Sequence, residues 1–211
     1  IFTVAVVAGQ NSNSLVVDRL GLGPQGVQPF TLRRVIAAVI ATIGVGIAVS
    51  DQFGGAGLAV GALLFALVAG AFVAAQQAVN GRVSGAAGSP WTAGLANFTA
   101  GWIGLSLALL ISHLVIPHGW TIPPVPWQHP VLWLGGVIGV AFIVVAASVI
   151  HLLGVLLFSL LSIAGQVTGA LFLDFAFPQA GHEFGWVLVV GVIVTGAAAA
   201  LAAFGRRPVR A

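Results

Sequence analysis

Cysteine and methionine are both absent from this chain of 211 residues, and charge is scarce. Without cysteine, the chain can form no disulfide, thiolate metal site or cysteine nucleophile. Charged residues make up 5% of the chain, against roughly 25% in a soluble domain. Because so few charges cannot cover a water-facing surface, the composition excludes a soluble globular enzyme, a disordered chain and a nucleic-acid-binding protein.

Apolar residues dominate instead, at 59% of the chain with a mean hydropathy of +1.13. A helix needs about 20 mostly apolar residues to cross a bilayer. The segments that meet or nearly meet this length are Ile1–Val17, Val35–Ser50, Gly57–Ala78, Trp91–Ile116, Val131–Ile150, Leu152–Leu173 and Phe184–Phe204. The sequence therefore predicts an all-α, polytopic bundle of transmembrane helices, with seven helices in this chain.

The charged residues indicate how these spans are oriented. The arginines are Arg19, Arg33, Arg34, Arg82, Arg206, Arg207 and Arg210. When the spans alternate in direction, all seven fall on one side of the membrane, whereas Asp51, Asp174 and Glu183 fall on the other. Because positively charged loops stay in the cytoplasm, the pattern predicts a cytoplasmic carboxyl terminus.

An internal repeat relates two parts of the chain. Ile1–Asp18 reads IFTVAVVAGQNSNSLVVD, and Leu157–Asp174 reads LFSLLSIAGQVTGALFLD. Both contain Ala-Gly-Gln and end in Asp, and the predicted topology places their ends on opposite sides of the membrane. Inverted repeats are a common construction of secondary transporters. We therefore assign residues 1–56 to the last two helices of a first repeat and residues 57–211 to a complete second five-helix repeat.

The repeat also bears on the length of the protein. The chain starts at Ile1 and lacks methionine, and five spans per repeat would place the start of the first repeat about 100 residues before Ile1. We expect a longer protein with ten spans, three of which precede this chain.

Amide side chains within the spans are candidates for substrate binding, because an unpaired polar group in hydrocarbon costs several kcal/mol. Gln76 and Asn80 are four residues apart and can share a helix face. Gln10 and Gln166 are equivalent in the repeat, and we expect Gln166 to face the bundle interior near the midplane, where such sites form. Amides donate and accept, which suits a neutral or zwitterionic substrate. The alternative is that they form hydrogen bonds between helices.

Three ionisable residues are candidates for coupling or gating. Asp18 and Asp174 end the repeated segments, and His151 lies between two spans. Ionisable groups within membranes usually serve function. The alternatives are interfacial helix ends, with Asp18 partnered by Arg19, and a hinge at His151. The histidines lack metal-ligand spacing and no Gly-x-Ser-x-Gly motif occurs, so we expect no metal, cofactor or enzymatic activity.

Several motifs resemble the YdcZ-like branch of the bacterial drug/metabolite transporter superfamily. In chain order they are Gln76-Gln77-Ala78-Val79-Asn80-Gly81-Arg82, Gly88-Ser89-Pro90, Ala96-Asn97-Phe98-Thr99-Ala100-Gly101, Trp133-Leu134-Gly135-Gly136-Val137-Ile138-Gly139 and Ala164-Gly165-Gln166 with Asp174. The resemblance implies inverted five-helix repeats in the bacterial inner membrane and export of small metabolites or drugs.

The resemblance also extends to individual residues, and this chain differs from the family pattern at two points. The residues that match the family pattern are Gln76, Asn80, Phe98, Gly101, Gln166 and Asp174. His151 stands where a proline is common, and the acidic residue in the first helix of small multidrug exporters is missing. The second departure speaks against proton-coupled export of cations.

Together these observations predict a secondary transporter that works by alternating access. Its partners would be a small-molecule substrate and the lipid bilayer, with Gln10, Gln76, Asn80 and Gln166 lining a cavity. Glycine stripes such as Gly165-x-x-x-Gly169 permit close helix contact, and we expect them to pack one monomeric bundle rather than a homodimer. The alternative is a membrane subunit or scaffold that transports nothing by itself.

Overall fold

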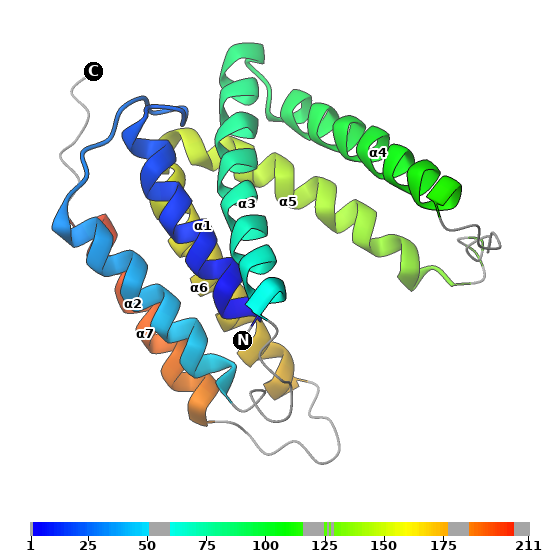
Figure 1. The fold of residues 1–211 in the computed structure, drawn as a ribbon. Coiled ribbons are helices and arrows are strands. Elements are labelled where there is room, and N and C mark those ends of the chain that lie inside the picture. Colours follow the sequence, from blue (N-terminus) through cyan, green and yellow to red (C-terminus); the bar gives the residue numbers. More distant parts are fainter. Residues whose placement is uncertain are drawn as a thin grey trace. The chain divides into compact units, whose positions relative to one another are not determined.

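The computed structural model describes residues 2–50, 60–115, 125, 127, 129–176 and 186–204, and these residues form helices joined by turns (Figure 1). The helices are α1 (Phe2–Arg19), α2 (Leu32–Ala48), α3 (Val60–Ala87), α4 (Pro90–Val115), α5 (Val131–Leu153), α6 (Val155–Ala176) and α7 (Trp186–Ala203). The described part of the chain contains no strand. The all-α prediction is confirmed.

The helices differ in how well they could cross a membrane. By length and composition, α3 to α7 are each long and apolar enough to do so. Helix α2 has only 17 residues, and α1 carries a polar run from Gln10 to Ser14. Asp51, Glu183 and the three arginines after Phe204 lie outside the described residues, so the orientation of the spans stays a prediction.

Two helix boundaries differ from the sequence prediction. Helix α3 continues to Ala87, whereas the hydropathy pattern ends near Ala78. Hydropathy marks where a helix leaves the bilayer, and a helix can continue into polar surroundings beyond that point. The break between α5 and α6 lies at Gly154 rather than at His151, because Gly154 adopts a φ of 73°, which side chains disfavour.

One compact part of the molecule comprises residues 1–79 and 150–211. Within it, α1 and α6 run in opposite directions, because Ser14 meets Ser159 while Asp18 meets Val155 (Figure 1). The inverted repeat predicts these opposite directions, and the structure confirms them. The core between α1, α2, α6 and α7 consists of Leu15, Ala37, Ala38, Ala41, Leu156, Leu160, Ala198 and Ala199.

Glycines allow two pairs of helices in this part to approach closely. A Cβ atom on Gly9 would lie 1.9 Å from the carbonyl oxygen of Leu67, and one on Gly70 would lie 1.9 Å from that of Val6. Helices α1 and α3 therefore cross with backbone against backbone. Helices α2 and α7 are similarly close, since a Cβ on Gly191 would lie 2.5 Å from the Cβ of Ala48. Small residues at such crossings are typical of membrane helices.

The other compact part comprises residues 80–149. It contains α4 and the adjoining portions of α3 and α5. Phe98 packs against Gly139, where an added Cβ would lie 3.1 Å from the tip of the ring. Most of the remaining surface of α4 is exposed and apolar, including Trp102, Leu105 and Leu114. Such a surface suits contact with lipid.

Candidate functional site

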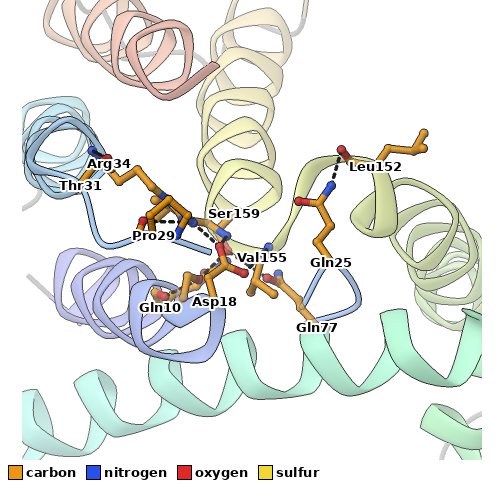
Figure 2. A network of polar contacts seen from close by, with 12 residues as sticks. Gln10, Asp18, Gln25, Pro29, Thr31, Arg34, Gln77, Leu152, Val155 and Ser159 are labelled. Carbon is orange, nitrogen blue, oxygen red and sulfur yellow. Dashed lines mark hydrogen bonds and ion pairs between the residues drawn. The ribbon is translucent and has the colours of Figure 1, made fainter. Parts of the chain in front are cut away.

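The carboxylate of Asp18 lies at the centre of a buried polar network (Figure 2). Asp18 is the next-to-last residue of α1 and is 1% exposed. One carboxylate oxygen accepts from the backbone N–H of Val155 at 3.0 Å, and the other accepts from that of Leu156 at 3.1 Å. The first N–H groups of a helix have no partner within the helix. Asp18 therefore caps the start of α6 from a distant part of the chain.

Arg34 supplies the positive charge that balances Asp18. Its guanidinium forms an ion pair with the carboxylate and also donates to the carbonyl of Pro29 at 3.2 Å. Thr31 caps the start of α2, accepting from the backbone N–H of Arg34 at 3.4 Å. This cap fixes the first turn of α2 and so positions the arginine. The sequence-based alternative paired Asp18 with Arg19, but Arg19 is exposed.

One turn deeper, two serines and a glutamine join three helices, and Figure 2 labels Ser159 and Gln77 among them. The hydroxyls of Ser14 on α1 and Ser159 on α6 are 3.0 Å apart. Ser159 also donates to the side-chain oxygen of Gln77 on α3 at 3.0 Å. Ser14 and Ser159 are fully buried. This Ser14–Ser159–Gln77 cluster places hydroxyl and amide groups between the two repeat-related helices.

Two asparagines of α1 extend the polar contacts to neighbouring helices. Asn11 donates to the carbonyl of Ala38 at 3.3 Å and to the hydroxyl of Thr42 at 3.2 Å, both on α2. Asn13 donates to the carbonyl of Ala71 on α3 at 2.6 Å. The side-chain oxygen of Asn11 is buried and has no partner among the described residues. An acceptor in this state suits a water molecule or a polar ligand atom.

A comparison with protein families gives the class of the molecule. Residues 61–201 match the family model described as "Putative inner membrane exporter, YdcZ", which covers more than half of the chain. The chain belongs to this family. No curated protein and no solved structure matches it. As a member of this inner membrane exporter family with several apolar helices, the protein is a multi-pass membrane protein.

The match to the exporter family covers most of α3 to α7 and does not include α1 and α2. Gln77 and Ser159 therefore lie within the matched region, whereas Asp18, Ser14 and Gln10 lie before it. The site thus combines residues of the exporter family match with residues that are linked to it through the internal repeat.

The repeat-equivalent glutamines lie in different surroundings. Gln10 is buried at 7% exposure. Gln166 is exposed, and its amide donates to Ser162 on the same helix at 3.2 Å. The expectation that Gln166 faces the interior of the bundle near the membrane midplane stays a prediction. A role in substrate binding stays a prediction for both residues.

The two predicted amides of α3 differ in burial. Asn80 is buried and donates to Asn97 at 3.3 Å, but Gln76 is exposed. The buried polar residues of α3 are Gln77, Asn80 and Ser84. Residues spaced by three and four share one helix face. Gln76 lies at the exposed edge of this face, and its role beside Asn80 in substrate binding stays a prediction.

The other two candidates for coupling or gating differ from Asp18. Asp174 lies near the end of α6 and is exposed, and its side chain makes no hydrogen bond or ion pair within the described part of the chain. His151 has an exposed side chain, whereas its backbone carbonyl accepts from Gln25 at 3.1 Å. Of the three candidates, only Asp18 belongs to the buried network. Gating or coupling roles for these residues stay predictions.

Sequence reasoning missed several members of the site. Ser14 and Ser159 carry no motif, and Gln25 and Arg34 lie outside or at the edge of the spans. Serines in apolar helices commonly bond to their own backbone, so their presence alone does not indicate a contact between helices. The available signal was position: Ser14 lies one turn before Asp18 and therefore on the same face of α1.

Proposed function

We propose that the protein is a secondary transporter that exports a small metabolite or drug by alternating access. The observation that carries the proposal is the unequal packing of α6 along its length. All six residues from Val155 to Leu160 are buried, whereas none from Ala164 to Ala176 is buried. The antiparallel helix α1, which is equivalent in the repeat, packs against the buried half.

This inequality supports alternating access for a physical reason. Two helices of an inverted repeat can exchange environments, so that one end closes while the other opens. Here the Asp18 end of the α1–α6 pair is closed by hydrogen bonds, and the other half of α6 exposes Gln166, Thr168 and Asp174. We assign this structure to a state that is closed at the Asp18 end. The arginine pattern predicts that this end lies in the cytoplasm.

The side chains near the α1–α6 contact favour a neutral or zwitterionic substrate. They are amides and hydroxyls, and the charge of Asp18 is already balanced by Arg34. A cationic substrate would need a second carboxylate, and the remaining described carboxylate, Asp174, is exposed. Gln10 and Gln166 are the residues that we propose for substrate contact, together with Asn80. Gln76 remains a candidate on the exposed face of α3.

One observation favours the alternative of a non-transporting subunit. Ser14, Ser159 and Gln77 satisfy one another, as expected for polar residues that only hold helices together. A transporter and a scaffold can be distinguished by an experiment on reconstituted protein. A scaffold leaves solute distributions unchanged, whereas a transporter moves a solute across a sealed vesicle.

The test is transport by the full-length protein in proteoliposomes, with a panel of labelled neutral and zwitterionic metabolites. We expect uptake or efflux of at least one solute above that of empty vesicles, and about a tenfold loss in Gln166→Leu, the usual scale when one polar contact is removed. Gln28→Leu is the matched control, because Gln28 lies between α1 and α2, outside the helices. Absence of transport across the panel would favour the scaffold, and normal transport by Gln166→Leu would exclude that residue from the substrate site.

A further inference from the structure

The junction between α5 and α6 leaves backbone groups without partners in their own helices. Only Gly154 separates the end of α5 at Leu153 from the start of α6 at Val155. The last carbonyl groups of α5 and the first N–H groups of α6 have no partner within their own helix. Each such group needs a partner from the protein or from water. The partners come from the end of α1 and from the segment that joins α1 to α2.

The two ends of the junction are bound by different side chains, one at the end of α1 and one in the segment that follows it (Figure 2). Asp18 accepts from the N–H groups of Val155 and Leu156. Gln25 donates to the carbonyls of His151 and Leu152 at 3.1 and 2.8 Å. The anionic group thus faces the positive end of one helix dipole, and the amide donor faces the negative end of the other. Both helix ends are held from outside their own repeat.

The segment between α1 and α2 is itself folded to present these groups. The N–H of Gln28 donates to the carbonyl of Asp18 at 2.8 Å, which closes the segment into a loop. Gly23 lies against the junction, where an added Cβ would be 3.0 Å from Val155 and 3.2 Å from the carboxylate of Asp18. A side chain at this position would press on both.

We propose that Asp18, Gln25 and Arg34 form a latch that holds the α5–α6 junction against α1 and releases during the transport cycle; the release rests on the proposed function. The contacts join α1 of one repeat to α5 and α6 of the other. Rocking one repeat against the other changes the distance between them, so these hydrogen bonds cannot persist in both states. Gln25 and Arg34 are partly exposed, so water can replace their contacts when the latch opens.

Distance measurements between two spin labels test the latch directly. The chain contains no cysteine, so in a protein with Leu22→Cys and Leu152→Cys the spin labels would attach only at these two positions. The side chains of Leu22 and Leu152 are both exposed. They report on the loop and on the junction. We expect a short main distance in the parent protein. In Asp18→Asn, Arg34→Gln and Gln25→Ala we expect a longer distance to gain about tenfold in population relative to the short one, a typical coupling between two states.

Matched controls separate the latch from general effects of charge and folding. Arg33→Gln removes an exposed neighbouring arginine and should leave the distances unchanged. Gln25→Ala removes a partly exposed side chain and keeps the buried ion pair, so it remains informative should Asp18→Asn fail to fold. An unchanged distance distribution in folded Gln25→Ala and Arg34→Gln would overturn the latch.

Transport measured on the same protein separates the latch from the proposed function. A short bis-maleimide that joins the two introduced thiols of the Leu22→Cys, Leu152→Cys protein should stop transport, and each single-cysteine protein treated alike should transport normally. Full transport by the cross-linked protein would overturn the release of the latch. If the distances respond to Gln25→Ala while the parent protein moves no solute, the latch holds and the proposed function fails.

Discussion

The two copies of the Ala-Gly-Gln repeat share residues but differ in surroundings. In α1, Gly9 contacts the backbone of α3, Gln10 is buried, and Asp18 caps α6. In α6, Gly165 has no atom within 4 Å of the position of an added Cβ, and both Gln166 and Asp174 are exposed. The shared glycine, glutamine and aspartate are thus packed in the first copy and open in the second.

This difference shows that the repeated residues do not by themselves make a site. Glycine allows close contact only where a second helix is present, and a carboxylate becomes a cap only where a helix begins beside it. Substitutions at equivalent positions should therefore have unequal effects, and the inequality can be measured.

The largest difference is expected at the glycines. Gly9→Val would place a side chain onto the backbone of Leu67 and should lower the free energy of unfolding by about 3 kcal/mol. Gly165→Val should change it by less than about 1 kcal/mol, because Gly165 is exposed. Unfolding of both variants in mixed detergent micelles gives the two values. Equal losses would mean that α6 is packed as closely as α1.

The aspartates should differ less strongly. Asp18→Asn leaves Arg34 without its charge partner and weakens a cap, so we expect a loss of about 2 kcal/mol in the free energy of unfolding. Asp174→Asn should change this quantity by less than about 0.5 kcal/mol. The same unfolding experiment applies, with Arg19→Gln as a control for loss of an exposed charge. A comparable loss in both aspartate variants would contradict the described asymmetry.

The smallest difference is expected between two hydroxyls of α6. Ser159→Ala leaves Ser14 and Gln77 without a shared partner and should cost about 1 kcal/mol. Thr168 bonds to the carbonyl of Ala164 on its own helix, and Thr168→Ser keeps this bond and should be close to neutral. A double-mutant cycle with Ser14→Ala measures the coupling at Ser159. Additive losses would show that the two hydroxyls act independently.

The features that depend on composition were predictable from the sequence. Hydropathy predicted the helices, and the repeat predicted that α1 and α6 run in opposite directions. Hydropathy did not predict which face of α3 is buried, because Gln76 and Gln77 are adjacent and either could pair with Asn80 by spacing. The packing of neighbouring helices decides this: Gln77 is buried and accepts from Ser159, whereas Gln76 is exposed.

The capping of α6 by Asp18 could not be predicted from the sequence for a related reason. The partner of Asp18 is Arg34 rather than Arg19, since adjacent residues on a helix point in different directions. Gln25 binds carbonyl groups 126 and 127 residues away. The backbone N–H and C=O groups at a helix end are the same for almost every residue type. The sequence therefore does not indicate which side chain will bind them.

The separation of these partners along the chain also sets an order in time during synthesis. Asp18 and Arg34 are 16 residues apart, whereas Val155 follows Asp18 by 137 residues. A ribosome adds about 5–20 residues per second, so roughly 7 to 27 s pass before the start of α6 emerges. Because Arg34 follows Asp18 closely in the chain, it can neutralise the carboxylate for most of that interval. When α6 is made, the carboxylate that caps its start can therefore already be paired with Arg34.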